Sequence, residues 1–281
     1  MKHHKITGGG GIQLHAVEAG NPKGRAVLFI HGFSQCWLAW RRQLSSDLAD
    51  DHLLVAMDMR GHGLSDKPRE GYDDSRLWAD DVNAVITALG LDHAVLCGWS
   101  YGPLLILDYI RHFGENNISA VQFVGGISKL GSDAASVITP EFLNLVPGFF
   151  STQVEESVRS MESLLRLCFV QEPSWEERYL MLGYNASVPP YVRQALFSRS
   201  FDNDDILAKI RKLVLITHGV RDSVVNPAVI EQHKALIPHA QIHLMHNAGH
   251  APFWDDAAGF NKRLRAFANS LQSSVAGVGP V

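Results

Sequence analysis

The chain has 281 residues, 46% of them hydrophobic, and a formal net charge of −4 at pH 7. A chain of this length can bury one large core, and α/β domains of this size commonly fold as one unit with an inserted segment. The slightly acidic balance argues against a nucleic-acid partner, and no apolar run approaches the ~20 residues that cross a bilayer. We therefore expect a small, uncharged or weakly charged substrate, with no nucleic acid and no membrane as partner.

The cysteines and the first residues bear on the cellular compartment. Cys36, Cys97 and Cys168 are widely spaced, which builds neither a disulfide framework nor a zinc motif. A run of glycines, not an apolar stretch, follows the basic start, so the beginning of the chain does not resemble a secretory signal. These features predict a cytoplasmic protein. We expect it to be a monomer or a homodimer.

Eight segments read as strands, because each is an apolar run or an alternation bounded by turn residues. In chain order they are Lys2–Thr7, Gln13–Glu18, Ala26–Ile30, Leu53–Met57, Ala94–Gly98, Ala120–Val124, Leu213–Thr217 and Gln241–Met245. Helical patterns lie between most of them, at Leu38–Leu48, Ser75–Leu89, Pro103–His112, Pro227–Leu236 and Asp255–Leu271. This alternation predicts a mostly parallel sheet with helices on both faces and ligands at the carboxyl ends of the strands.

The stretch from residue 129 to residue 204 breaks the alternation. It has no convincing core strand, and its helical pieces lie near Thr152–Phe169, Ser174–Leu182 and Tyr191–Ser200. Since it falls between the sixth and seventh predicted strands, we expect it to form a helical cap. The predicted fold class is α/β with an eight-stranded sheet, in which residues 1–128 and 205–281 form the core domain and residues 129–204 the inserted cap.

The motif Gly98-Trp99-Ser100-Tyr101-Gly102 stands between a predicted strand and a predicted helix. A strand-to-helix turn this tight forces its central residue into strained backbone geometry, which small neighbours two positions away on either side allow. Ser100 would stand at the tip of the turn with its hydroxyl exposed. The context favours Ser100 as a catalytic nucleophile.

A serine nucleophile needs a base, and the base needs an orienting acid. His250 follows the last predicted strand, and Asp222 lies just past the strand at Leu213–Thr217. The chain order Ser, Asp, His is that of the α/β-hydrolase nucleophile elbow. The predicted catalytic residues are therefore Ser100, Asp222 and His250.

The developing oxyanion also needs donors. The buried strand at Ala26–Ile30 stops at His31-Gly32-Phe33, where Gly32 permits a sharp turn that frees the N–H of Phe33. The N–H of Tyr101 begins the helix after the nucleophile and faces the same space. We assign the oxyanion hole to the backbone N–H groups of Phe33 and Tyr101.

With these parts in place, the sequence resembles the α/β-hydrolase superfamily. Within it, the resemblance is to small esterases, cofactor-free haloperoxidase-like perhydrolases, lactonases and carbon–carbon bond hydrolases. The matching motifs cover nearly the whole chain and are His31-Gly32-Phe33, Asp58-Met59-Arg60-Gly61-His62-Gly63-Leu64-Ser65-Asp66, Gly98 to Gly102, Gly219-Val220-Arg221-Asp222 and Gly249-His250.

Departures from the family pattern narrow the activity. Haloalkane dehalogenases and epoxide hydrolases of this fold carry Asp at the nucleophile position, so Ser100 disfavours both. The carbon–carbon hydrolases usually carry Asn before the serine, where this chain has Trp99, which weakens that reading without excluding it. Some relatives place the acid after the strand that follows the nucleophile helix, but Ala120–Val124 runs into Gly125-Gly126-Ile127-Ser128 with no carboxylate. Asp222 is therefore the better acid.

Apolar residues of the predicted cap, together with two tryptophans of the core, are candidates for a hydrophobic acyl or alcohol pocket. The alternative is that most of them pack the cap onto the core. The candidate substrate-binding residues are Trp37, Trp99, Phe142, Phe149, Phe150 and Tyr184.

Five histidines between residues 233 and 250 suggest a metal site, but His243 and His246 tend to face opposite ways along an extended chain and no acidic ligand lies nearby. We expect no metal and no cofactor. The sequence predicts a carboxylesterase for small, largely apolar esters or lactones, acting through an acyl-enzyme. The alternatives are a lactonase, a perhydrolase, a carbon–carbon bond hydrolase and, with less support, a non-catalytic ligand receptor.

Overall fold

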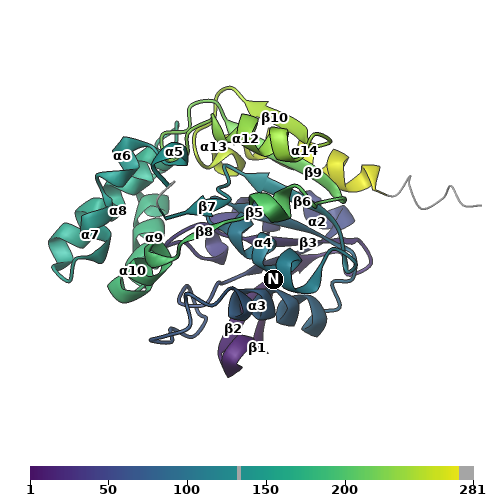
Figure 1. The fold of residues 1–281 in the computed structure, drawn as a ribbon, viewed down its shortest axis with the longest axis horizontal. Coiled ribbons are helices and arrows are strands. Elements are labelled where there is room, and N and C mark those ends of the chain that lie inside the picture. The colour runs from purple at the N-terminus through teal and green to yellow at the C-terminus, as the bar shows by residue number, and fades with distance from the viewer. Residues whose placement is uncertain (132–133, 272–281) are drawn as a thin grey trace, which may run out of the picture.

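A computed structural model describes residues 1–131 and 134–271 of the chain. Its main sheet has eight strands in the order β1-β2-β4-β3-β5-β6-β9-β10 (Figure 1). The pairs β1·β2 and β2·β4 are antiparallel, and the remaining pairs are parallel. The strands are β1 (Lys2–Thr7), β2 (Gln13–Gly20), β3 (Arg25–Ile30), β4 (His52–Met57), β5 (Ala94–Trp99), β6 (Ile118–Val124), β9 (Leu213–Gly219) and β10 (Gln241–Met245).

All eight predicted strands are confirmed, each within two residues of its expected ends. The central strands β3 and β5 are buried along nearly their whole length, as continuous apolar runs such as Ala26–Ile30 require. The predicted α/β class with a mostly parallel sheet is therefore confirmed.

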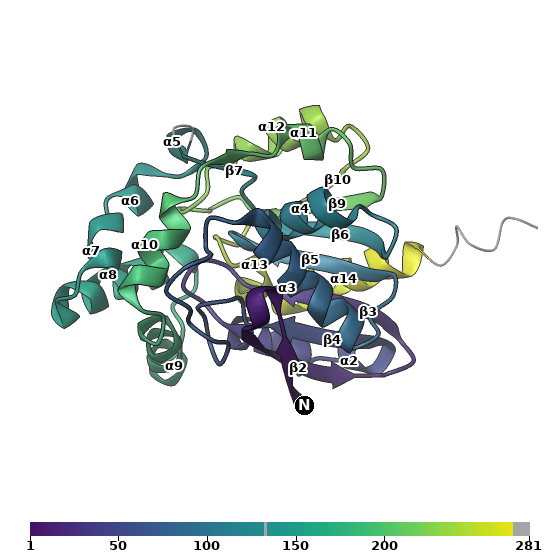
Figure 2. The same cartoon turned by 60° about the horizontal axis from the view of Figure 1, so that its bottom comes forward.

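Helices cover both faces of the sheet. In Figure 2, α3 and α4 lie in front of the strands and α14 lies behind them. The helices of the sheet layers are α1 (Arg41–Leu44), α2 (Leu48–Asp51), α3 (Ser75–Ala88), α4 (Gly102–Phe113), α11 (Asp204–Leu207), α12 (Val229–Leu236), α13 (Pro252–Asp255) and α14 (Ala257–Ser270), with short 3-10 turns η1 (Gly9–Gly11) and η2 (Trp37–Trp40).

Two predicted helices are broken. The pattern at Leu38–Leu48 becomes η2, α1 and α2, because the Ser46 hydroxyl donates to the Gln43 carbonyl (2.7 Å) and accepts from the Leu48 N–H (3.2 Å), in place of helical bonds. The pattern at Asp255–Leu271 splits into α13 and α14 at Asp256, whose backbone is non-helical and whose carboxylate caps Gly259.

We call residues 129–204 the cap segment, and its described residues lie beyond the ends of the central strands in both views (Figures 1 and 2). A short antiparallel ladder, not predicted, pairs Lys129-Leu130 with Phe201-Asp202 and joins the two ends of the segment. Its elements are β7 (Lys129–Leu130), α5 (Ala134–Val137), α6 (Pro140–Leu143), α7 (Val146–Phe150), α8 (Val154–Cys168), α9 (Trp175–Ala186), α10 (Pro190–Ser198) and β8 (Phe201–Asp202). The division into a core domain (residues 1–128 and 205–281) and a cap domain (residues 129–204) remains a prediction.

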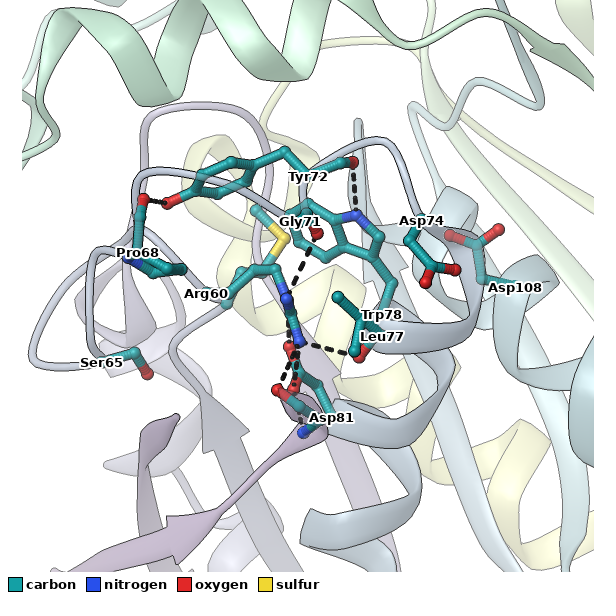
Figure 3. Close-up of polar contacts among 12 residues, drawn as sticks. Arg60, Ser65, Pro68, Gly71, Tyr72, Asp74, Leu77, Trp78, Asp81 and Asp108 are labelled. Carbon is teal, nitrogen blue, oxygen red and sulfur yellow. Dashed lines mark hydrogen bonds and ion pairs between the residues drawn. The ribbon is translucent and has the colours of Figure 1, made fainter. Parts of the chain in front are cut away.

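The loop after β4 is held by a buried ion pair (Figure 3). The Arg60 Nε donates to Asp81 Oδ2 of α3 at 2.7 Å, and Nη2 donates to Oδ1 at 2.9 Å. Arg60 also donates to the carbonyls of Gly9, Gly71 and Leu77, so the side chain of one loop residue ties η1 and α3 to the loop. The side chains are 1% and 0% exposed.

Burial raises the pKa of Asp81 more than the Arg60 guanidinium lowers it. We expect Asp81→Asn to lower the free energy of unfolding by about 3–5 kcal/mol, because the substitution leaves the Arg60 charge buried and unpaired. The double variant Arg60→Met/Asp81→Leu should be more stable than Asp81→Asn alone. Urea unfolding of the three proteins measures this, and a double variant less stable than the single one would contradict it.

Candidate active site

Ser100 occupies the turn between β5 and α4 in a left-handed conformation, with φ of 58°. This region is costly for a residue with a side chain and requires support from its surroundings. The Ser100 N–H donates to the Val124 carbonyl of β6 at 2.9 Å, and the Ser100 carbonyl accepts from the Ile127 N–H at 3.1 Å. Both backbone groups of Ser100 are thus held by the neighbouring strand and its loop.

The two outer glycines of the motif are required by close packing. A Cβ at Gly98 would lie 2.6 Å from the Pro103 nitrogen, and one at Gly102 would lie 2.6 Å from the Ile30 carbonyl oxygen. Real Cβ atoms essentially never approach backbone atoms so closely. The G-x-S-x-G spacing therefore follows from how tightly the turn packs on itself and on the end of β3.

Asp222 and His250 meet at the carboxyl ends of β9 and β10. The His250 Nδ1 lies 2.9 Å from Asp222 Oδ2, and the Asp222 side chain is fully buried. The other oxygen, Oδ1, accepts from the N–H groups of Val224 (2.8 Å) and Val225 (2.9 Å). A carboxylate so held can orient the imidazole and stabilise its protonated form.

A second histidine, which the sequence reasoning missed, also contacts this carboxylate. His218 Nε2 lies 3.2 Å from Asp222 Oδ2 and 3.3 Å from the Val225 carbonyl oxygen. Since a carbonyl only accepts, Nε2 of His218 carries a proton. The sequence does carry a sign of this contact. His218 stands four residues before Asp222 at the end of a predicted strand, and the turn that follows the strand brings the two side chains together.

Burial raises the pKa of Asp222, but the neighbouring His250 and His218 lower it by more, so its pKa lies well below the usual range. The carboxylate is therefore ionised throughout the neutral range. Such a group stabilises the fold above its unfolded pKa of about 4, and that stability is lost as the pH falls toward the lower folded pKa.

Trp99, a predicted substrate-binding residue, holds the loop of His250. Its indole N–H donates to the His250 carbonyl at 2.8 Å, and the two rings lie 5.5 Å apart between centroids. The residue before the predicted nucleophile thus fixes the predicted base relative to it.

The turn after β3 brings Gly32 against Ser100. A Cβ at Gly32 would lie 2.9 Å from the Ser100 Cβ. The His31 ring fixes this turn, since its Nε2 accepts from the Met59 N–H (3.1 Å) and its Nδ1 therefore donates to the Gly32 carbonyl (2.8 Å). In residues 1–131 and 134–271, neither the Phe33 N–H nor the Tyr101 N–H donates a hydrogen bond. Both remain available to a ligand.

Two cavities meet at Ser100. The first, with about 360 Å³ of empty volume, is almost entirely apolar, and we call it the Ile127 cavity. The second, with about 260 Å³, contains His250, and we call it the His250 cavity. Phe33, Ser100, Phe142 and Val224 line both. The Ile127 cavity adds Tyr101, Ile127, Leu130, Ile138, Leu196, Phe197 and Val225, and the His250 cavity adds Gly32, Gln35, Trp99, Leu164, Cys168 and His250.

The predicted substrate-binding residues divide between these cavities and the packing around them. Phe142 lines both cavities, and Trp99 lines the His250 cavity. Phe149 lines neither cavity, and its ring packs 5.5 Å from Phe33 and 5.7 Å from Phe142. Phe150 also lines neither and contacts Phe197.

Trp37 and Tyr184 lie outside both linings. The Trp37 ring packs against His3 and His15 near β1 and β2, while the backbone N–H of Trp37 donates to the Asp58 carboxylate. Tyr184 of α9 is buried. Several lining residues, such as Gln35, Leu196 and Val224, were not predicted, because nothing in the local sequence marks the direction of their side chains.

The described part of the chain holds no group of three or more His, Cys, Asp or Glu side chains suited to a metal ion. Of the five clustered histidines, His233 lies 3.0 Å from the Ser128 hydroxyl and His239 lies 3.0 Å from the Lys212 carbonyl, on separate segments. No helix within residues 1–131 and 134–271 is long and apolar enough to cross a membrane.

The His218 contact gives a pH-dependent prediction. His218→Leu removes one donor from Asp222 and moves the folded pKa of Asp222 toward its unfolded value. At pH 7 the variant should lose about 1.5–3 kcal/mol of unfolding free energy, as expected for a hydrogen bond to a charged group. The difference should narrow below about pH 4, where the Asp222 carboxylate of the folded variant takes up a proton while that of the folded wild type, whose pKa is lower, stays ionised. Urea unfolding from pH 7 down to the lowest pH at which both proteins still fold tests this; a difference that stays constant over that whole range would mean that His218 acts through packing alone.

Comparison with known proteins places this geometry in a family. A model of the α/β hydrolase fold matches residues 25–257. The structure of the esterase RhEst1 from Rhodococcus sp. ECU1013 is 34% identical, with a TM-score of 0.91 over 96% of this chain and 100% of that chain. The AB hydrolase superfamily protein YisY of Bacillus subtilis is 28% identical over 88% of this chain and 92% of its own length. The 2-hydroxy-6-oxo-2,4-heptadienoate hydrolase of Pseudomonas putida is 26% identical over 93% of this chain and 94% of its own. The chain belongs to the α/β-hydrolase family.

Proposed function

We propose that this protein is a serine carboxylesterase that cleaves small, largely apolar esters through an acyl-enzyme. The observation that carries the proposal is that Ser100, in its strained turn, and His250, paired with Asp222, line the same cavity. The similarity to a solved esterase over the whole of its chain adds support.

In the first half of the reaction, Ser100 Oγ attacks the acyl carbon while His250 Nε2 accepts the hydroxyl proton. Negative charge then develops on the carbonyl oxygen, where the N–H groups of Phe33 and Tyr101 are available to stabilise it. The carbon–oxygen bond to the alcohol breaks, and His250 gives the proton to the departing oxygen. The acyl group remains on Ser100, and the alcohol leaves.

In the second half, a water molecule gives a proton to His250 and attacks the acyl carbon. The tetrahedral species collapses, Ser100 Oγ recovers the proton from His250, and the carboxylic acid is released. Throughout, the ionised Asp222 stabilises the imidazolium form of His250 from 2.9 Å.

The lining of the cavities supports a small apolar substrate. The Ile127 cavity in particular is almost entirely apolar, as ligand pockets for apolar groups usually are. Phe33 and Phe142 line both cavities, and neither lining includes an Asp, Glu, Lys or Arg side chain. A charged acyl group would have to give up its hydration without a partner.

The test is hydrolysis of p-nitrophenyl esters from acetate to decanoate by the wild type and by Ser100→Ala. We expect a maximum at one acyl length, a burst of p-nitrophenol, and a fall in kcat of at least about 10³-fold in the variant, because loss of the nucleophile removes covalent catalysis. The matched control is Ser119→Ala, whose hydroxyl donates to the His93 carbonyl at the far end of β6 and which should keep wild-type turnover.

Turnover that survives in Ser100→Ala would contradict the assigned nucleophile. Absence of Ser100-dependent turnover with every ester would contradict ester hydrolysis and favour a lactone, carbon–carbon cleavage or a receptor role.

A further inference from the structure

The two cavities at Ser100 are chemically unequal. The Ile127 cavity is lined by aliphatic and aromatic side chains apart from Ser100 itself. The His250 cavity contains the imidazole and one carboxamide, that of Gln35. This asymmetry lets the two parts of an ester be assigned to the two cavities.

The leaving group must lie on the side of His250. In ester cleavage His250 donates its proton to the departing oxygen, so that oxygen has to come within hydrogen-bond reach of the ring. The alcohol part of the ester therefore extends into the His250 cavity, and the acyl part extends into the Ile127 cavity.

Gln35 is a polar side chain placed among apolar ones on the alcohol side. It is 3% exposed and shares the cavity with Trp99, Leu164 and Cys168. Its position is fixed by the turn after β3, where the Gln35 N–H donates to the Gly32 carbonyl at 3.3 Å. The carboxamide is thus held on the same turn that carries the Phe33 N–H.

The hydrogen bonds of the Gln35 carboxamide are largely unused. Within the described residues its one partner is Asn185 Oδ1 of α9, which accepts from Gln35 Nε2 at 3.4 Å, near the upper limit for such a bond. A carboxamide can make four hydrogen bonds, so this one keeps capacity for further partners where it lines the cavity. A hydrogen-bonding group of a substrate can take up that capacity.

Asn185 does not supply the remaining hydrogen bonds of the Gln35 carboxamide, because other contacts within the cap segment hold Asn185 in place. The side-chain Nδ2 of Asn185 donates to the Met181 carbonyl at 2.8 Å, and the backbone carbonyl of Asn185 accepts from the buried Arg193 at 3.1 Å. Arg193 also donates to the carbonyls of Phe149 and Val188. Gln35 therefore faces the cavity with a fixed neighbour and free hydrogen-bonding capacity.

From these contacts we propose that Gln35 is a specificity-determining residue that selects esters whose alcohol part carries a hydroxyl or another hydrogen-bonding group a few atoms from the ester oxygen. This inference rests on the proposed ester hydrolysis and names its substrate class: an apolar acyl group joined to a polar, uncharged alcohol.

The experiment compares two butyrate esters that differ only by exchange of a methyl for a hydroxyl, propyl butyrate and 2-hydroxyethyl butyrate. We expect the wild type to favour the hydroxyethyl ester in kcat/KM, and Gln35→Met, which keeps length and removes the amide, to lower that preference about 10-fold. The ratio of the two esters is read within each protein, so a loss of activity common to both cancels.

A second pair, ethyl 3-hydroxypropanoate and ethyl butanoate, places the same exchange in the acyl group. Because the acyl group lies in the Ile127 cavity, the ratio for this pair should be the same in the wild type and in Gln35→Met. A shift in the acyl pair instead of the alcohol pair would overturn the assignment of the two cavities.

The failures are distinguishable. If the wild type hydrolyses none of the four esters, the proposed ester hydrolysis fails. If it hydrolyses all four and Gln35→Met leaves the alcohol ratio unchanged, ester hydrolysis stands and the role of Gln35 is overturned.

Discussion

The left-handed backbone of Ser100 is the constraint on which the site depends. The conformational strain at Ser100 is offset by contacts with the ends of two neighbouring strands. The end of β6 accepts a hydrogen bond from the Ser100 N–H, and the Gly32 turn after β3 packs against the Ser100 Cβ. Parallel strands place these ends at one edge of the sheet, where β9 and β10 also bring Asp222 and His250. The sheet order thus creates both the strain and the neighbours that stabilise it.

Buried charges join the cap segment to that edge. Arg199, which follows α10, donates to Asp108 of α4 at 2.7 Å and to the Tyr101 hydroxyl at 3.3 Å. The Tyr101 hydroxyl in turn lies 3.3 Å from the Leu196 carbonyl of α10. Because Tyr101 also carries a proposed oxyanion donor, displacement of α10 would disturb the Ser100 turn as well as the wall of the Ile127 cavity.

The sequence allowed the strands and the Ser, Asp, His arrangement to be predicted because those signals are local. Most of the parallel strands read as buried apolar runs, and Ser100, Asp222 and His250 lie one, three and five residues past the ends of β5, β9 and β10. The helix breaks at Ser46 and Asp256 depend on side-chain hydrogen bonds that no periodicity reveals. Trp37 and Phe149 are as aromatic as Phe142, yet only Phe142 of the three lines a cavity, since tertiary packing sets the direction of each ring.

The polar side chains at the site differ in how many of their possible hydrogen bonds they form within the protein. This difference distinguishes a group that is held in place from a group that can bind a ligand. Asp222 has four neighbouring donors, at Val224, Val225, His218 and His250, so its orientation is fixed before any ligand arrives. The Gln35 carboxamide has one long contact in the same part of the molecule. The fully bonded Asp222 carboxylate holds the proposed base, His250, in a fixed position. The Gln35 amide can instead form further hydrogen bonds when a ligand supplies a partner. The proposed selectivity for the alcohol thus rests on a group that the fold leaves with hydrogen-bonding capacity, and the proposed catalysis rests on groups that the fold pairs.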